Sequence, residues 1–235
     1  MNAAGKITIR YLQYYLAQKD CNREDPDAYS LKLAEEIGEL AHVFAREVPP
    51  ATESSFKGSA EEELWDVLYY TLCIANLHHI DLELWILRKD HYYAQLHSGY
   101  RLLQPDVPPE SEASRRGCLT VKGLQLHFLQ RAADPRGILF YFCKLCEEMG
   151  ELIRVLVRGH APACEEKFLG STEDALSDVV SYVMILADLR QIDLERWIPF
   201  KEALNAKKWN QPIPFDPEGW RGEEKNTYPL VGFAD

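Results

Sequence analysis

Apolar residues recur along most of this chain at alternating spacings of three and four, which is the periodicity of one face of an α-helix. Two such stripes, in separate parts of the chain, have the same spacing. Their positions are Tyr29, Leu33, Glu36, Leu40 and Val43, and then Tyr141, Leu145, Glu148, Leu152 and Val155. Continuous strand patterns are absent from the sequence. The pattern therefore predicts an all-α protein.

A second amphipathic segment follows each stripe. One face carries Glu63, Asp66, Tyr70, Cys73 and Leu77 in the first case, and Ala175, Asp178, Tyr182, Ile185 and Leu189 in the second. The opposite sides are also apolar, as at Leu64, Val67 and Leu68, which is typical of a helix inside a bundle. The segments 47–60 and 159–172 are rich in Pro, Ser and Gly and predict loops, with Ser59 and Ser171 as helix N-caps.

These similarities extend to residue identities at a constant offset. Glu39 and Glu151 are 112 positions apart (151 − 39 = 112), and so are Asp66 and Asp178. The string Ile-Asp-Leu-Glu at 80–83 returns at 192–195 without a gap. Duplication of one helical unit is the simplest explanation. We therefore expect a first repeat at 1–103, a linker at 104–117, a second repeat at 118–210 and an irregular C-terminal tail at 211–235.

The composition narrows the function classes. The formal net charge of −11 argues against general affinity for nucleic acid or for an anionic membrane. No apolar run is long enough to cross a bilayer, and residues 1–6 lack the apolar core of a signal peptide. Cys143 and Cys146 form a CxxC without a second CxxC, so zinc binding is weakly supported. Reduced thiols and a cytoplasmic location fit these observations.

The acidic residues point to a metal site. Glu36 and Glu39 are neighbours on one predicted helix face, as are Glu63 and Asp66 on the next helix. Four converging carboxylates suit Mg²⁺, with Mn²⁺ as an alternative. A solvated acidic face is the other interpretation. However, like charges at this spacing cost a helix roughly 0.2–0.5 kcal/mol per pair, and Glu36 and Asp66 lie in apolar stripes. Glu35 and Glu62 are either further ligands or surface residues.

The pattern ExxE followed by ExxD resembles the all-α nucleoside triphosphate pyrophosphohydrolases, which include MazG proteins, dimeric dUTPases and dCTP pyrophosphatases. In this sequence it is carried by Glu36, Glu39, Glu63 and Asp66, within a resemblance that covers roughly 25–95 and 137–210. The resemblance implies two MazG-like repeats packed as an intrachain pseudo-dimer. It also implies Mg²⁺-dependent cleavage of a free (d)NTP between the α- and β-phosphates. In that interpretation Glu35, Glu36, Glu39, Glu63 and Asp66 are catalytic, and the last four bind the metal.

The second repeat departs from the pattern, because Ala175 stands at the position of Glu63. Glu148, Glu151 and Asp178 remain and form a possible degenerate site. The basic residues that contact phosphates in this family have the opposite distribution. The second repeat has Lys201, Asn205, Lys207 and Lys208, whereas the first keeps Lys89 but has Tyr93 and Gln95. We therefore predict a composite site, with metal ligands from the first repeat and phosphate contacts from the second.

Other interpretations stay open at this stage. Trp65, Tyr69 and Trp85 are candidates for base stacking, and each could equally be a core residue. A catalytically reduced nucleotide-binding or structural protein is the main alternative function, and a phosphoribosyl-ATP pyrophosphohydrolase is another. A homodimer of pseudo-dimeric chains is also open. The sequence does not reveal the base or the sugar of the substrate.

Overall fold

The computed structural model describes residues 7–19, 26–46, 48–103, 117–131, 136–159, 163–164, 167–220 and 222. This described part is all-helical and contains no extended strand, as predicted. Its helices are α1 (Ile9–Lys19), α2 (Pro26–Ala45), a 3₁₀ turn (Glu53–Ser55), α3 (Ala60–Leu77), α4 (Leu82–Leu96), α5 (Val121–Arg131), α6 (Gly137–Arg158), α7 (Thr172–Leu189) and α8 (Leu194–Trp209). The predicted linker lies outside the described residues, apart from Gly117.

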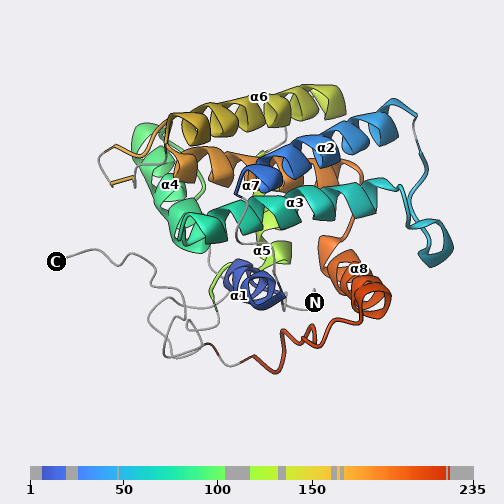
Figure 1. Ribbon diagram of the computed structural model, residues 1–235. Coiled ribbons are helices and arrows are strands. Elements are labelled where there is room, and N and C mark those ends of the chain that lie inside the picture. Colours follow the sequence, from blue (N-terminus) through green and yellow to red (C-terminus); the bar gives the residue numbers. More distant parts are fainter. Residues whose placement is uncertain are drawn as a thin grey trace.

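The helices pack in layers, with α2 and α6 on one side, α3 and α7 beneath them, and α1 and α5 below (Figure 1). The central helices α3 and α7 contact each other, and both are apolar nearly all round. Helix α4 packs on α7, and α8 packs on α3. The last helix of each half of the chain therefore contacts the central helix of the other half.

Local capping explains where the two central helices begin. The side chain of Ser59 accepts a hydrogen bond from the backbone N–H of Glu62 (3.3 Å), and Ser171 accepts one from Asp174 (3.1 Å). Both predicted N-caps are confirmed. Acidic residues occupy the first turn of each helix, where the helix dipole favours negative charge. The caps place the acidic residues of α3 and α7 at equivalent heights in the bundle.

The helix bounds follow the offset of 112 found in the sequence, since α5 and α7 begin and end 112 residues after α1 and α3. Contacts recur as well. The Gln13 side chain donates to the carbonyl of Ile80 (2.8 Å), and Gln125 donates to Ile192 (2.8 Å). Our sequence interpretation did not identify α1 or α5. The identities Thr8/Thr120, Leu12/Leu124 and Gln13/Gln125 at the same offset carried that signal.

The segments that precede α1 and α5 join the two halves. Thr8 and Thr120 form an isolated antiparallel bridge, in which Ile9 N–H donates to the Leu119 carbonyl (3.0 Å). Beside it, the buried carboxylate of Glu83 accepts hydrogen bonds from the backbone of Cys118 and Leu119. Gly117 has φ +88°, and a Cβ there would lie 2.6 Å from Oε2 of Glu83. Only glycine fits this close approach.

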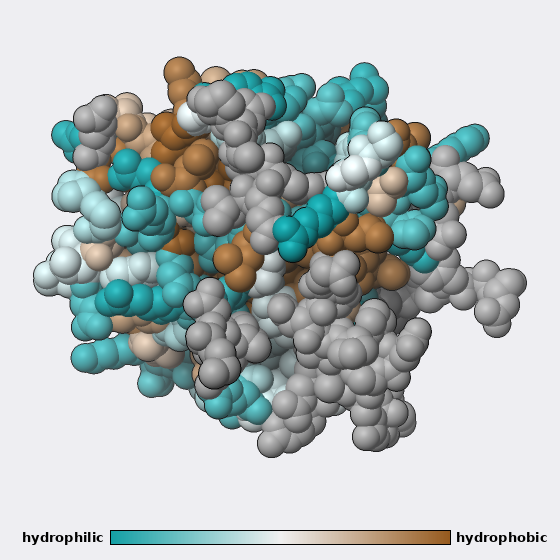
Figure 2. All heavy atoms as spheres, turned by 180° about the vertical axis from the view of Figure 1, so that it is seen from behind, coloured by the Kyte–Doolittle hydropathy of each residue, from teal (hydrophilic) through white to brown (hydrophobic). Residues whose placement is uncertain are grey.

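The described part of the tail covers α1. The ring of Phe215 meets Tyr11 and Tyr15 edge-on, and Trp220 stacks on Tyr14 at 5.3 Å. The predicted tail aromatics Tyr228 and Phe233 lie outside the described residues. Seen from behind, the surface shows apolar patches separated by hydrophilic side chains and by grey atoms (Figure 2). Among the described helices, none is both long and apolar enough to span a membrane.

Candidate active site

Three carboxylates of the first half converge between α2 and α3. One oxygen from each of Glu36, Glu39 and Glu63 lies within 4.8 Å of the other two. Glu39 is exposed, Glu36 is half-buried and Glu63 is buried. Among the described residues, no other group of three His, Cys, Asp or Glu side chains meets this spacing. The cluster therefore opens to solvent at Glu39 and is closed at Glu63.

Burial and mutual repulsion raise the pKa values of this cluster. Burial, followed by the charges of Asp66 and Glu39, raises the pKa of Glu36 from 4.5 to about 7. The same causes raise the pKa of Glu63 to about 8. Burial also raises the pKa of Asp66 from 3.8 to about 6, against the opposing effect of Lys201. The cluster thus retains protons near neutral pH, and a cation that displaced them would relieve the repulsion.

Lys201 of α8 reaches this site from the other half of the chain. Its Nζ donates to Oδ2 of Asp66 at 2.8 Å and also to Glu62. Burial lowers the pKa of Lys201, but Asp66 and Glu62 more than offset this effect, so the pKa is raised and the ammonium stays charged. Asp66 is therefore held by Lys201 and lies outside the group of three carboxylates.

The acidic residues at the start of α3 hold the loop before it. Glu62 accepts from the backbone N–H of Gly58 (2.7 Å) as well as from Lys201. The buried Glu61 accepts from the backbone of Ala51 (2.7 Å). These contacts fix residues 51–58 against the helix. Glu62 thus has a defined structural contact on each side rather than an open surface position.

Below the cluster, α8 carries a buried acid that our sequence interpretation missed. Glu202 is 1% exposed and accepts from Lys19 (2.6 Å), from the Tyr15 hydroxyl (2.7 Å) and from the Trp65 indole (3.1 Å). Its counterpart at the offset of 112 is Asp90, also acidic and buried. That recurrence was the available signal. Glu202 anchors α8 on α3 and so positions Lys201.

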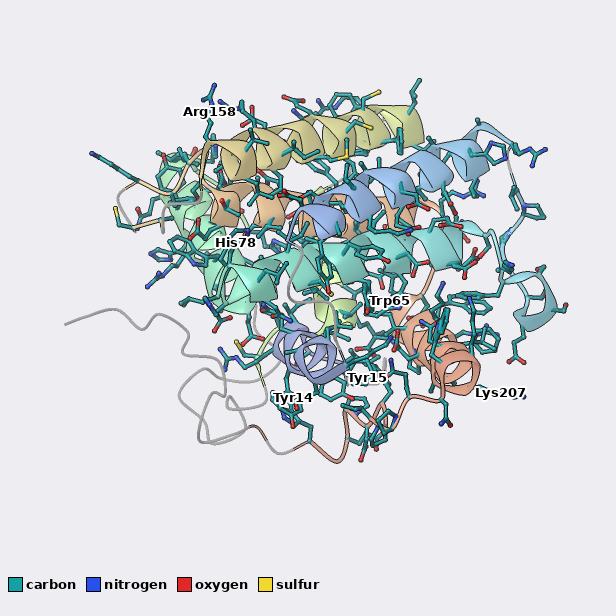
Figure 3. All side chains as sticks on the ribbon, viewed as in Figure 1. Tyr14, Tyr15, Trp65, His78, Arg158 and Lys207 are labelled. Atoms are coloured by element: carbon teal, nitrogen blue, oxygen red, sulfur yellow. The ribbon has the colours of Figure 1, made fainter. Side chains whose placement is uncertain are left out.

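The other predicted phosphate contacts have different surroundings. Asn205 donates to Glu202 at 3.4 Å, Lys207 is exposed on the outer side of α8 (Figure 3), and Lys208 lies 4.5 Å from the ring of Trp209. Glu35 pairs with Lys32 at 2.6 Å on the exposed side of α2. Within the described part of the chain, these four side chains form no hydrogen bond or ion pair with Glu36, Glu39 or Glu63.

The burial of Trp65 contradicts the base-stacking role that was open for this residue. We considered it as a base-stacking residue, but its side chain is completely buried between α3 and α8 (Figure 3). Its ring packs edge-on against Tyr69, and its N–H is satisfied by Glu202. A substrate base has no access to this ring in the structure. The apolar pattern on both sides of α3 favoured the core interpretation, and Trp65 is a core residue.

The second half has an equivalent ion pair between the two halves of the chain, but it lacks the cluster of three carboxylates. Lys89 of α4 bonds Asp174 and Asp178 of α7, each at 2.5 Å. Glu151 pairs with Arg154 (2.7 Å), whereas the equivalent of Arg154 in the first half is His42. Ala175 supplies no carboxylate. The second half thus lacks one acid of the first-half cluster, while Lys89 pairs with Asp174 and Asp178 as Lys201 pairs with Glu62 and Asp66.

A cluster of three carboxylates between two helices of a bundle has the donor atoms of a divalent-metal site. The family model described as the MazG nucleotide pyrophosphohydrolase domain matches residues 24–88. Residues 24–88 are therefore similar to a MazG domain, and the match supports a nucleotide pyrophosphohydrolase role at the level of the family. The matched span includes Glu36, Glu39, Glu63 and Asp66. No curated protein and no solved structure matches the chain.

Proposed function

We propose that this protein is a Mg²⁺-dependent nucleoside triphosphate pyrophosphohydrolase. It cleaves a (d)NTP between the α- and β-phosphates and releases a monophosphate and pyrophosphate. One observation carries the proposal: the three carboxylates that converge from α2 and α3 lie inside the segment that matches the MazG domain. The reaction takes place in the first half of the chain.

The donor set fits Mg²⁺. Carboxylate oxygens are its preferred protein ligands, and Mg²⁺ holds them at about 2.0–2.1 Å, so opposite ligands are about 4.2 Å apart. Oxygens within 4.8 Å of one another are close to that spacing. Glu36, Glu39 and Glu63 would hold the ion, and Asp66 would join them when Lys201 turns to the substrate. Bound there, Mg²⁺ would neutralise phosphate charge and lower the pKa of a water.

Lys201 is the leading phosphate contact. It is charged, belongs to α8 of the second half, and already lies at the edge of the first-half acids. When a triphosphate enters, its oxygens compete with Asp66 and Glu62 for the ammonium. Asn205, Lys207 and Lys208 follow on the same helix and are further candidates for the outer phosphates. This arrangement supports the composite site predicted from the distribution of acids and bases.

The two halves then act as an intrachain counterpart of a dimer. The reciprocal pairs Lys201–Asp66 and Lys89–Asp178 support this interpretation, since each joins the last helix of one half to the central helix of the other. In such an arrangement one half can lose its metal ligands while it still supplies Lys201. The same arrangement supports the interpretation of the chain as a tandem duplication.

The direct test is pyrophosphate release from a panel of ribo- and deoxyribonucleoside triphosphates, with Mg²⁺ and with EDTA. We expect monophosphate and pyrophosphate in a metal-dependent reaction. Diphosphate and inorganic phosphate would show cleavage at the wrong bond. Glu36→Gln is the loss variant and Glu148→Gln, its counterpart 112 positions later, is the matched control.

A second candidate function is nucleotide binding without turnover. The missing ligand at Ala175 and the ion pair of Glu151 with Arg154, where the first half has His42, favour it for the second half of the chain. Tight, metal-dependent triphosphate binding without any pyrophosphate release from the whole panel would support this alternative over hydrolysis.

A further inference from the structure

A cavity that the proposed reaction does not use lies where α4 of the first half packs on the second half. Its volume is about 660 Å³, and its walls come from α4, α6 and α7, with residues 97–103 and Phe128 of α5. Aromatic side chains dominate these walls: Tyr93, His97, Tyr100, Phe128, Tyr141 and Tyr182. Ligand sites in proteins commonly have volumes of about 300–1,000 Å³ and aromatic linings. The cavity therefore has the size and the surface of a small-molecule site.

The comparison with the first half explains why the space is open. Ser177 and Ser181 line the cavity, and the residues 112 positions earlier are Trp65 and Tyr69. In the first half, those two rings pack against each other, and Lys19 lies 4.9 Å from the Tyr69 ring. Two hydroxymethyl groups occupy far less volume than an indole and a phenol. The two serines of α7 thus leave space that Trp65 and Tyr69 fill in the first half.

The ring-lined wall is suited to a planar molecule. Tyr93 is stacked with His97 and with Tyr100, at centroid distances of 6.1 and 6.3 Å. Burial raises the pKa of Tyr182 and of Tyr93, so both phenols stay neutral and can donate hydrogen bonds. Stacking of a base on an aromatic side chain contributes about 1–3 kcal/mol. Rings with adjacent hydroxyl groups recognise a flat heterocycle that has polar edges.

The charges argue against a phosphate chain. Lys89 faces the cavity, but it is paired with Asp174 and Asp178. Asp90 adds a further negative charge to the lining, and it accepts from the Tyr100 hydroxyl and from the Leu103 backbone. Arg136 is the other basic residue of the wall. A triphosphate would meet a site with no net positive charge, whereas an uncharged ligand would not be repelled.

We propose that this cavity binds an uncharged nucleobase or nucleoside, without a phosphate chain and without a metal ion. The site is separate from the proposed hydrolytic site and does not depend on it. Bases and nucleosides share the stacking chemistry that the wall offers. Binding by both the free base and the nucleoside places recognition on the ring, and binding by the nucleoside alone shows that the sugar contributes.

The test uses the full-length protein in EDTA and calorimetric titration with adenosine, guanosine, cytidine, uridine, adenine and uracil. We expect saturable binding of at least one of these probes. Ser181→Tyr, which installs the first-half residue, should weaken that binding by at least about tenfold. Tyr93→Leu removes one ring without adding volume and should also weaken it. Ser54→Tyr makes the same chemical change as the first variant at an exposed loop position and should not.

Glu63→Gln separates this site from the hydrolytic one, since nucleoside binding should persist in that variant even when hydrolysis is lost. Four results would overturn the proposal. They are no saturable binding of any probe, binding that requires Mg²⁺, binding unchanged in both Ser181→Tyr and Tyr93→Leu, and tighter binding of the matching triphosphate in EDTA with the same sensitivity to Ser181→Tyr.

Discussion

The two halves of this protein have the same helix order but different side chains at the positions that carry chemistry. In the first half, Glu36, Glu39 and Glu63 converge, and large rings fill the space beside them. In the second half, Ala175 stands in place of one acid, and Arg154 forms an ion pair with Glu151. The small side chains of Ser177 and Ser181 leave space for a cavity. The backbone tolerates both arrangements. The bundle thus fixes backbone positions, while a few substitutions decide which half brings three carboxylates together.

The largest expected effect is on turnover. Glu36→Gln and Asp66→Asn should each reduce pyrophosphate release by at least about a hundredfold, because a neutral amide cannot replace an anionic oxygen on Mg²⁺. The second-half counterparts, Glu148→Gln and Asp178→Asn, should have much smaller effects. Equal losses in both halves would mean that the two clusters act together. Circular dichroism of each variant verifies that the fold is retained.

Lys201 should have the next largest effect. A charge-assisted contact to phosphate contributes about 1.5–3 kcal/mol, so Lys201→Met should lower kcat/KM by roughly ten- to a hundredfold at about 1.4 kcal/mol per tenfold. Methionine keeps the apolar stem of the side chain. Lys89→Met, in α4 of the first half, is the matched control because it breaks the equivalent ion pair with Asp178. It should lower stability without a comparable loss of kcat/KM. A larger activity loss from Lys89→Met than from Lys201→Met would mean that the phosphate contacts come from α4 and not from α8.

The pH dependence of stability sharpens the comparison further. The folded-state pKa values of Glu36 and Glu63 are raised from 4.5 to about 7 and about 8. Their contribution to stability is fully present below about pH 4.5 and is lost as pH rises through 7 to 8. In EDTA, the melting temperature of Glu63→Ala relative to wild type should therefore rise over this window. Mg²⁺ should reverse the trend by stabilising the wild type alone. A difference that stays constant with pH would contradict the assigned pKa shifts.

The smallest effect on activity is expected at Trp65. Trp65→Phe removes the indole hydrogen bond to Glu202 and part of a buried ring, which should cost about 1–3 kcal/mol of unfolding free energy. The KM for the nucleotide should stay within about threefold of wild type, because the ring is core and not substrate surface. Denaturant unfolding and steady-state kinetics measure the two quantities. A large rise in KM with unchanged stability would restore the base-stacking interpretation.

Much of the fold followed from periodicity and from the repeated spacing. The stripes around Leu33 and Leu145 predicted α2 and α6, and the serine caps marked the starts of α3 and α7. Helices α1 and α5 were missed, because they are short and their strongest evidence is polar: the repeated Gln13 and Gln125, which bond to backbone carbonyls. The spacing of apolar residues predicts which face of a helix is buried. It does not predict a polar side chain that bonds to the backbone of a distant helix or loop.

The candidate site was also partly predictable, because its residues on one helix follow a local spacing. Spacing on a helix predicts that Glu36 and Glu39 share a face, and the family resemblance adds Glu63. Neither the spacing nor the resemblance predicts that Lys201 pairs with Asp66, because that contact depends on how α8 packs across α3. Glu202 was missed because its only sequence signal is the acidic residue Asp90 at the offset of 112, and its burial depends on how α8 packs against α1 and α3. The cavity beside Ser181 depends on tertiary packing of four elements.

We propose that the first half alone holds a divalent ion. The most direct measurement is the number of Mn²⁺ ions bound per chain, by calorimetry or electron paramagnetic resonance, in wild type, Glu63→Ala and Glu148→Gln. Glu63→Ala copies the second half, since alanine stands at position 175. We predict that tight binding is lost in Glu63→Ala and retained at wild-type stoichiometry in Glu148→Gln. Loss of the ion in Glu148→Gln, or its retention in Glu63→Ala, would contradict the account.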